Sequence, residues 1–201
     1  MGGSPTLRAR RAAATRAQLV AVATDLFAER GHAGTSVEDI LQRAGVARGA
    51  LYHHFAGKNA LFRAVCESVQ TDTAARVSAV VGAQDAWDGL RAGLSALLDA
   101  CLEPAFRRIV ILDSVAVLSR GGWDGEVDDR EPPVLGDVLA PLVGKYFPEL
   151  PQMALAHIIL GALYSAALYI ARSSAPGVAR AEADAVLDTF IAGLRTPRPV
   201  G

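Results

Sequence analysis

The sequence predicts an all-α protein with a small N-terminal head of three helices and a larger C-terminal helical body. Apolar residues recur at spacings of three and four along most of the chain, which is the helical signature, and no segment alternates convincingly as a strand would. Prolines punctuate these apolar segments, as they do where helices begin and end. Because hydrophobic residues make up 51% of the 201 residues and charged residues 20%, the chain can build a sizeable core.

The charged residues are divided unevenly along the chain. Residues 1–66 hold nine Lys and Arg against four Asp and Glu, and acidic residues dominate beyond residue 66. A basic N-terminal third followed by an acidic remainder indicates a head that binds a polyanion and a soluble body. The alternative is that this asymmetry of charge arose by chance. We expect residues 1–14 to form a flexible basic arm.

The first helix is expected from Thr15 to Arg30. Gly31 follows it at the position of a C-terminal cap. The helix carries a single apolar stripe, which consists of Leu19, Val22, Ala23, Leu26 and Phe27.

Residues 35–63 predict two shorter helices separated by a tight turn. The first extends from about Val37 to Ala44, and Thr35 before it stands at the spacing of a capping box with Glu38 in its first turn. Gly45 supplies the backbone freedom of a sharp turn, and the second helix begins near Arg48. This is the layout of a helix-turn-helix, whose second helix enters the major groove of DNA.

A longer helix is expected to begin at Gly57 and Lys58 and to run to about Val80, leading directly into the body. Residues 108–112 are rich in β-branched side chains, but we predict a helix there because the apolar pattern continues without alternation and Pro104 suits a first helical turn. The body helices are expected over residues 85–102, 104–119, 134–147, 152–173 and 178–195.

Two metal chemistries are excluded by spacing. The acidic loop at residues 121–131 resembles a calcium loop, but counting from Asp124 the required Gly and Glu positions hold Asp129 and Leu135. Cys66 and Cys101 form no CxxC pair, which argues against a zinc site or a disulfide framework and fits a reducing compartment. We expect no metal and no cofactor.

The Arg-rich start has no apolar segment of a signal peptide, so we expect a cytoplasmic protein. Residues 153–171 contain no charged side chain and are long enough to span a membrane. Small and polar residues at helical spacing argue against a membrane span. They favour a dimer in which the last two helices of one copy pack against the last two helices of a second copy. A core within one chain and a membrane span remain alternatives. The expected dimer residues are Ala154, Gly161, Ala162, Ser165, Ala166, Leu187, Phe190 and Ile191.

A specific combination of residues marks positions 15–66. It comprises Leu26-Phe27 followed by Gly31, Thr35-Ser36-Val37 with Asp39-Ile40, Ala44-Gly45-Val46, Gly49, Leu51-Tyr52, His54-Phe55, Lys58 and Ala60-Leu61. In these features the segment resembles the DNA-binding domain of the tetracycline-repressor (TetR) family. Residues 67–201 resemble the family only in length, helical character and two long final helices.

The resemblance implies a sequence-specific DNA-binding transcriptional regulator. It implies a homodimer that reads a palindromic operator, and a repressor released when a small apolar or amphipathic effector enters the body, residues 67–201. By position, the resemblance implies that the bases are contacted by Arg48, Gly49, Ala50, Tyr52 and His53. It implies that the phosphates are contacted by Thr35, Ser36, Val37, Tyr52, His54 and Lys58.

Physical chemistry supports several of these assignments independently. Arg48 can donate twice to guanine, and Gly49 lets the backbone approach the duplex. Lys58 would combine a cation with the free N–H groups of a helix N-terminus. The arm's Arg8, Arg10 and Arg11 could follow the backbone or enter the minor groove. Ala47 stands where the family often has Ser or Thr, and its side chain has no oxygen that could cap the helix or bond a phosphate.

Polar groups within the apolar body helices could be structural or could contact an effector. An unpaired buried charge is costly, so Asp113 and His157 should each have a partner, with Arg107 or Arg108 available to Asp113. The candidate effector residues are Asp113, Phe106, Trp123, His157 and Tyr164.

Two other functional classes compete with a ligand-responsive repressor. A DNA-binding regulator without a small-molecule effector would share the head and lack a cavity in the body. An enzyme is not expected, because the chain contains no Walker A loop and no GxGxxG, HExxH or GxSxG motif.

Overall fold

A computed structural model describes residues 6–81, 86–118 and 151–195, and every regular element within these ranges is a helix. The predicted all-α fold is confirmed. The predicted acidic loop, with Trp123, and the predicted helix at 134–147 lie outside the described residues. The elements are α1 (Leu7–Arg30), α2 (Val37–Ala44), α3 (Arg48–His54), α4 (Lys58–Val81), α5 (Ala86–Ala100), η1 (Phe106–Asp113), α6 (Ser114–Leu118), α8 (Gln152–Arg172) and α9 (Pro176–Arg195).

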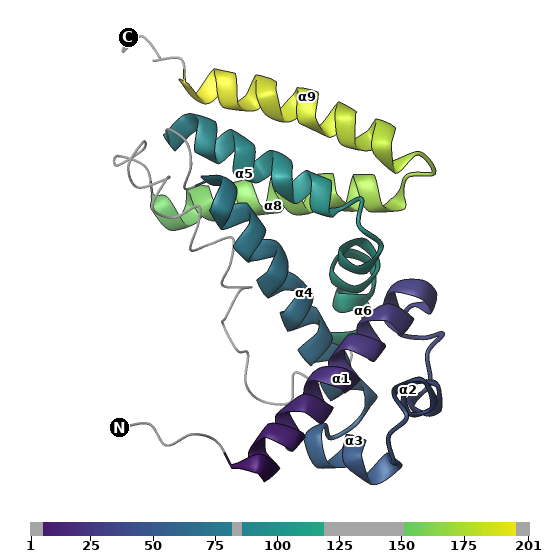
Figure 1. The fold of residues 1–201 in the computed structure, drawn as a ribbon. Coiled ribbons are helices and arrows are strands. Elements are labelled where there is room, and N and C mark those ends of the chain that lie inside the picture. Colours follow the sequence, from purple (N-terminus) through teal and green to yellow (C-terminus); the bar gives the residue numbers. More distant parts are fainter. Residues whose placement is uncertain (1–5, 82–85, 119–150, 196–201) are drawn as a thin grey trace.

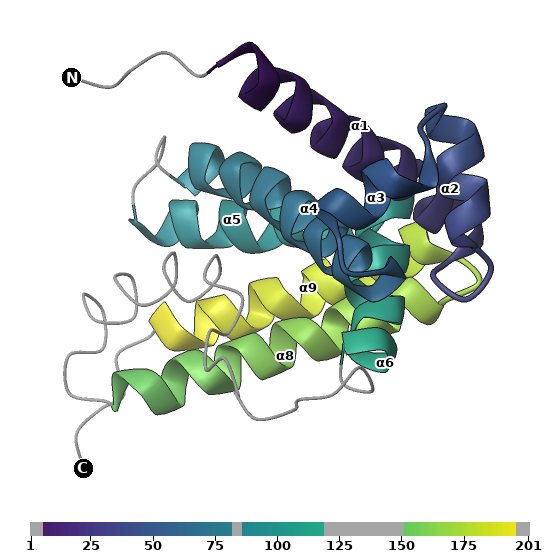
Figure 2. The ribbon, with the colours of Figure 1, turned by 90° about the horizontal axis from the view of Figure 1, so that it is seen from below.

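The helices form a head and a body that α4 connects (Figure 1). Helices α1, α2 and α3 make the head, and α5, α8 and α9 lie side by side in the body, in contact with one another. The short segment of η1 and α6 lies between α1 and the body in Figure 1, and η1 contacts both α1 and α8. Figure 2 shows from below that α5 lies beside α4 and that α9 lies beside α8. None of the described helices has the length and apolar character needed to cross a membrane.

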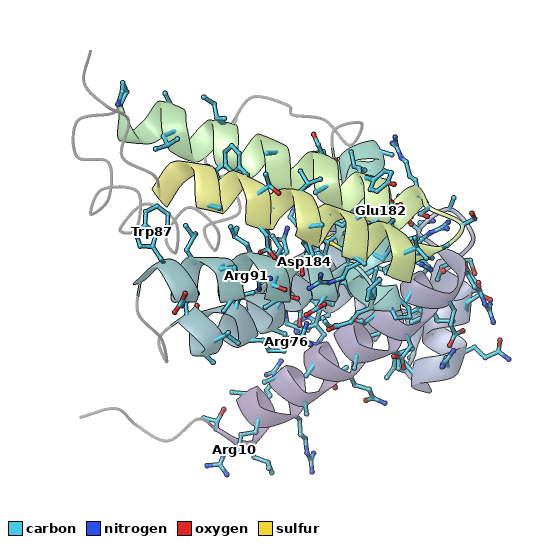
Figure 3. All side chains as sticks on the ribbon, turned by 90° about the horizontal axis from the view of Figure 1, so that it is seen from above. Arg10, Arg76, Trp87, Arg91, Glu182 and Asp184 are labelled. Carbon is cyan, nitrogen blue, oxygen red and sulfur yellow. The ribbon has the colours of Figure 1, made fainter. Side chains whose placement is uncertain are left out.

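Helix α1 begins at Leu7 rather than Thr15, so the prediction of a flexible arm is wrong for residues 7–14. Thr6 caps the helix, because its Oγ1 accepts a hydrogen bond from the Ala9 N–H at 3.3 Å. The following residues are mainly Ala and Arg, which have high intrinsic helix propensity. The basic residues of this segment therefore lie on a helix, and Arg10 lies near its N-terminal end (Figure 3).

Two clusters of buried apolar residues hold the protein together. The head cluster unites α1, α2, α3 and the first turns of α4, and in it the rings of Phe27 and Phe62 meet edge to face at 5.1 Å. Ile109 of η1 is fully buried in this same cluster. Since η1 also supplies Phe106 and Val110 to the body cluster, this one segment packs into both parts of the protein.

The η1 segment is helical, as predicted, but it has the wider π-helical hydrogen-bonding pattern over Phe106–Asp113. Such segments are rare, and they are frequently found at functional sites. Here the segment lies where head and body meet.

An ion-pair network fixes α9 against α5. Arg180 Nε lies 2.7 Å from Asp99 Oδ1, and Arg180 Nη1 lies 3.1 Å from Asp184 Oδ2. Arg91 of α5 approaches Asp184 at 3.6 Å and Asp188 at 2.7 Å. Figure 3 shows Arg91 and Asp184 between the two helices. The Arg180 side chain is largely buried, so its two carboxylate partners compensate its desolvation.

Candidate nucleic-acid interface

Helices α2 and α3 form the predicted helix-turn-helix. Gly45 ends α2 with a φ of 65°, in the left-handed region that glycine adopts without strain. Its N–H is bonded to the carbonyls of Leu41 and Gln42. The chain then turns and α3 begins at Arg48, as the sequence predicts.

Ser36 caps the N-terminus of α2, one residue later than predicted. Ser36 Oγ accepts from the Asp39 N–H at 3.0 Å, and the Asp39 carboxylate accepts from the Ser36 N–H at 2.9 Å. The Ser36 hydroxyl also donates to Asp39 Oδ2 at 2.6 Å, and this bond, followed by that of the Ser36 N–H, lowers the pKa of Asp39. The predicted capping box of Thr35 and Glu38 is therefore wrong, because Thr35 is used inside the head.

Helix α3 presents the predicted base-reading residues on its outer side. Leu51 is fully buried in the head cluster, and Phe55 at the end of the helix is buried beside it. With these two side chains fixing one face of α3 inward, the other face turns to solvent. Ala50 is half-buried at its edge, and the exposed residues are Arg48, Gly49, Tyr52 and His53.

Two contacts hold the side chain of Arg48, and sequence reasoning identified neither. Its Nη2 lies 2.7 Å from Oε1 of Glu38 on α2. Its guanidinium also lies over the ring of Tyr52, 5.9 Å from the centroid. Glu38 was assigned to a cap, so its place at the interface follows only from the structure.

Thr35 is turned inward and cannot bind a phosphate through its side chain. The residue is 1% exposed. Its hydroxyl lies 2.9 Å from the Gly31 carbonyl and 3.2 Å from the Leu26 carbonyl, beneath the end of α1. The Thr35 hydroxyl is therefore not available for the predicted phosphate contact, because it closes the end of α1.

Lys58 has a structural role that the sequence did not predict. Its Nζ donates to the His32 carbonyl at 2.9 Å and to the Thr35 carbonyl at 3.0 Å. Because an ammonium has three N–H donors, two of the three are used inside the head. These bonds tie the start of α4 to the loop that joins α1 and α2.

The other predicted phosphate contacts have mixed surroundings. Ser36 is exposed next to its capping partner, and the half-buried His54 ring lies 5.0 Å from that of His53. Val37 is half-buried and packs against the head cluster, so only its backbone could meet a phosphate. Arg16 of α1, absent from the predictions, lies over the Phe55 ring at 5.2 Å and braces α1 against α3.

Both halves of the chain match known protein families. Residues 19–65 match the bacterial regulatory proteins of the tetR family, and residues 87–194 match the tetracyclin repressor-like C-terminal domain. The crystal structure of a TetR-family transcriptional regulator from Pectobacterium atrosepticum is 34% identical in sequence, with a TM-score of 0.80. That likeness covers 96% of this chain and 100% of the other. The chain belongs to the TetR family.

Curated TetR-type regulators match through the head. The transcriptional repressor KstR2 of Rhodococcus jostii is 48% identical over 46 residues, 23% of this chain and 22% of its own. The regulator TtgR of Pseudomonas putida is 46% identical over 55 residues, 27% of this chain and 26% of its own. This chain thus spans about a quarter of the length of the curated relatives it matches. TetR-family proteins are DNA-binding transcriptional regulators and not enzymes, as the sequence predicts for this chain.

In this TetR-family protein a polar joint connects η1 of the body to the end of α1. The Asp113 carboxylate accepts a hydrogen bond from the His32 N–H at 2.8 Å and lies 3.4 Å from Arg108 Nε. Gly31 makes room for this joint, since a Cβ there would stand 2.3 Å from Arg108 Nη2. Arg108 is one of the two partners predicted for Asp113, so the structure supplies the ion pair that a structural role for Asp113 requires.

The described candidate effector residues do not share one site. Phe106 is buried in the body cluster, whereas Tyr164 is exposed on the outer side of α8. Asp113 is bonded to the head, as described above. The side chain of His157 lies outside the described residues, as does Trp123.

The predicted dimer residues are divided between the surface and the core. Ala154, Gly161, Ala162 and Ser165 are exposed on one face of α8, where a Cβ added to Gly161 would meet no atom within 4 Å. Ala166 and Leu187 are half-buried and pack against the body cluster of their own chain. Phe190 is 48% exposed, and the side chain of Ile191 lies outside the described residues.

The two cysteines are buried thiols. Burial raises the pKa of Cys66 and of Cys101 to about 12, so both are protonated at neutral pH. Among the described residues no group of three or more His, Cys, Asp and Glu could hold a metal ion.

His32 is expected to make the stability of the protein depend on pH. Burial, followed by the charge of Lys58, holds the pKa of His32 below its ordinary 6.5, and its Nε2 finds no hydrogen-bond partner in the described structure. The unfolded chain therefore takes up this proton first, and stability falls as the pH drops below about 6.5 toward the folded-state pKa.

Urea unfolding at a series of pH values measures this effect. His32→Gln should flatten the dependence between neutral pH and the acidic end of that window. His53→Gln, at an exposed position on α3, is the matched control and should leave the dependence in place. An unchanged slope in His32→Gln would contradict the assignment.

Proposed function

We propose that this protein is a transcriptional repressor that binds a palindromic operator as a homodimer and is released by a small apolar or amphipathic ligand in its body. The observation that carries the proposal is the outer face of α3, where Arg48, Tyr52 and His53 are exposed opposite the buried Leu51. A helix held in this way can enter the major groove with those side chains leading.

The base contacts follow from the chemistry of this face. Arg48 can donate to O6 and N7 of a guanine. Gly49 is exposed and has no neighbouring atom within 4 Å of a Cβ position, so the duplex can approach its backbone closely. Ala50, Tyr52 and His53 complete the base-reading set.

Contacts to the DNA backbone surround this face. Ser36 and His54 are proposed to lie near phosphates, with the Tyr52 hydroxyl and the backbone at Val37. The exposed Arg8, Arg10 and Arg11 on the first turns of α1 add positive charge that can follow the phosphate backbone. The Thr35 side chain is not included, because its hydroxyl is bonded within the head. Lys58 is proposed to contact a phosphate through the third N–H of its ammonium, since the other two are bonded within the head.

The homodimer is supported by an uncovered apolar face on α8 and α9. Ile158 is 65% exposed on α8, in line with Ala154, Gly161, Ala162 and Ser165. On α9, Val186 and Phe190 are also exposed. Because small residues allow close approach and large apolar residues gain by burial, two such helix pairs can pack as a four-helix interface. Two heads held in this way would read two inverted half-sites.

A ligand in the body is supported by the fold it shares with a regulator that binds one. FadR from Bacillus subtilis, crystallised in complex with stearoyl-CoA, has a TM-score of 0.70 to this chain at 16% identity, over 88% of this chain and 97% of its own. We propose that an apolar or amphipathic molecule enters the helical body here as well. Its binding would reach the head through α4 and through the joint at Asp113.

Selection of bound duplexes from a random DNA pool tests the proposal. We expect the protein to recover two inverted half-sites, with binding that weakens steeply as salt increases. Arg48→Ala should lose roughly 10- to 100-fold in affinity for each half-site, the value of one bidentate arginine–guanine contact of about 1–3 kcal/mol. Arg43→Ala, which removes an exposed arginine from α2, serves as the control in a mobility-shift assay. Full sequence-selective binding by Arg48→Ala would contradict the base-reading assignment.

A further inference from the structure

An ion pair joins the two helices of the helix-turn-helix at its outer edge. Glu38 stands in the first turn of α2 and Arg48 at the first residue of α3, and Oε1 and Nη2 are 2.7 Å apart. The two side chains are 65% and 64% exposed, so the pair belongs to the surface of the head and not to its core. Exposed pairs of this kind contribute little to stability. Stability therefore gives no reason for an acidic residue beside the leading arginine of a DNA-binding surface.

The contacts of Arg48 leave part of its guanidinium free. Glu38 engages one terminal nitrogen, and the ring of Tyr52 lies 5.9 Å from the guanidinium carbon. A guanidinium has five N–H donors in a planar fork, so donors remain for a base. A carboxylate on one edge and a ring on one face restrict the rotation of a long side chain that would otherwise be free.

The neighbouring acidic residues of the head are engaged elsewhere. Asp39 is bonded to Ser36 and lies 3.9 Å from Arg30. Glu29 lies 3.1 Å from Arg43 on the side of α2 that meets α1. Within the described part of the chain, the carboxylate that meets Arg48 is thus that of Glu38.

We propose that Glu38 is a specificity-determining residue that positions Arg48 for guanine. The inference rests on the proposed base reading by Arg48. By holding one edge of the guanidinium, Glu38 keeps Arg48 pointed at the base edges and away from the phosphates, which are the competing partners of any arginine in a groove. The carboxylate also repels phosphates, so it weakens binding to DNA of any sequence. Both effects widen the ratio between specific and non-specific binding.

This role predicts that two affinities move in opposite directions. Glu38→Gln should strengthen binding to a random duplex, because a negative charge is lost and Arg48 can turn to a phosphate. The same change should reduce discrimination in favour of the guanine that Arg48 reads by about five- to tenfold, within the range of a single base contact. A new phosphate contact should steepen the salt dependence of random-duplex binding by about one unit of slope.

The experiment uses the full chain and the duplex recovered by the selection, together with copies in which each guanine of a half-site is replaced in turn. Affinities are measured for the unmodified protein and for Glu38→Gln, Arg48→Ala and the double variant. Glu29→Gln is the matched control, because it removes the same charge from an exposed ion pair of the same head. Melting temperatures verify that each variant is folded.

The expected result is a loss of guanine discrimination in Glu38→Gln, no further loss when it is added to Arg48→Ala, and full discrimination in Glu29→Gln. Retained discrimination in Glu38→Gln overturns the proposal. An equal loss in the Arg48→Ala background, or in Glu29→Gln, also overturns it, because the effect would then be independent of Arg48 or due to charge alone. Discrimination retained by Arg48→Ala itself would instead show that the proposed base reading is wrong.

Discussion

Ile158→Glu is expected to convert the protein from a dimer into a monomer at micromolar concentration. Ile158 is 65% exposed in the single chain, and the small residues in line with it on α8 would let a second copy approach closely. In a two-fold interface the substitution occurs twice and places two carboxylates among apolar groups. Burying unpaired charges costs several kcal/mol, which corresponds to a loss of dimer affinity of about hundredfold or more.

Sedimentation of the unmodified protein and the variant measures this change. Leu7→Glu is a close control, because Leu7 is 67% exposed and stands on α1, at the far end of the head. It should leave the sedimentation coefficient of a dimer unchanged. A monomer in the unmodified protein would remove the dimer proposal, and a dimeric Ile158→Glu would show that another face is used.

The same variant separates assembly from base reading. Its head is untouched, so the monomer should still recognise a half-site. It should bind a complete palindrome much more weakly than the dimer, because the second head no longer binds at a high effective concentration. The affinity for a single half-site should therefore be nearly the same for both proteins.

The helices were predictable from sequence because their apolar stripes and caps are local. The stripe from Leu19 to Phe27 and the buried pair Leu51 and Phe55 behave as their spacing requires. The α1 error was also local: charge density suggested a flexible arm, although the Ala and Arg content and Thr6 already favoured a helix.

The corrected contacts depend on residues that are distant in sequence. Two capping pairs, Thr35 with Glu38 and Ser36 with Asp39, share the same spacing, so local pattern alone does not choose between them. The choice is made by burial of Thr35 beneath α1. Because Glu38 takes no part in the cap, its carboxylate is available to form the ion pair with Arg48. In the same way, the partner of Asp113 is a backbone N–H that lies 81 residues away in the chain.

Asp113→Ala is expected to lower the free energy of unfolding by about 1–2 kcal/mol, because the part-buried N–H of His32 loses its acceptor. The Asp113 side chain is 17% exposed and accepts from the His32 N–H at 2.8 Å. Its contact with Arg108 adds little, because the arginine side chain is 45% exposed and can turn to water. Asp113→Asn keeps an acceptor oxygen for His32, so we expect a smaller loss.

Urea unfolding and amide hydrogen exchange test this prediction together. Exchange at the His32 N–H should accelerate in Asp113→Ala, since that proton loses its acceptor. Glu103→Ala breaks the exposed pair with Arg76, whose atoms are 3.0 Å apart, and should change stability by about 0–1 kcal/mol without affecting exchange at His32. Unchanged exchange in Asp113→Ala would mean that the N–H is protected by burial alone. Accelerated exchange would show that the carboxylate of η1 secures the end of α1, which gives the body a hold on the head besides α4.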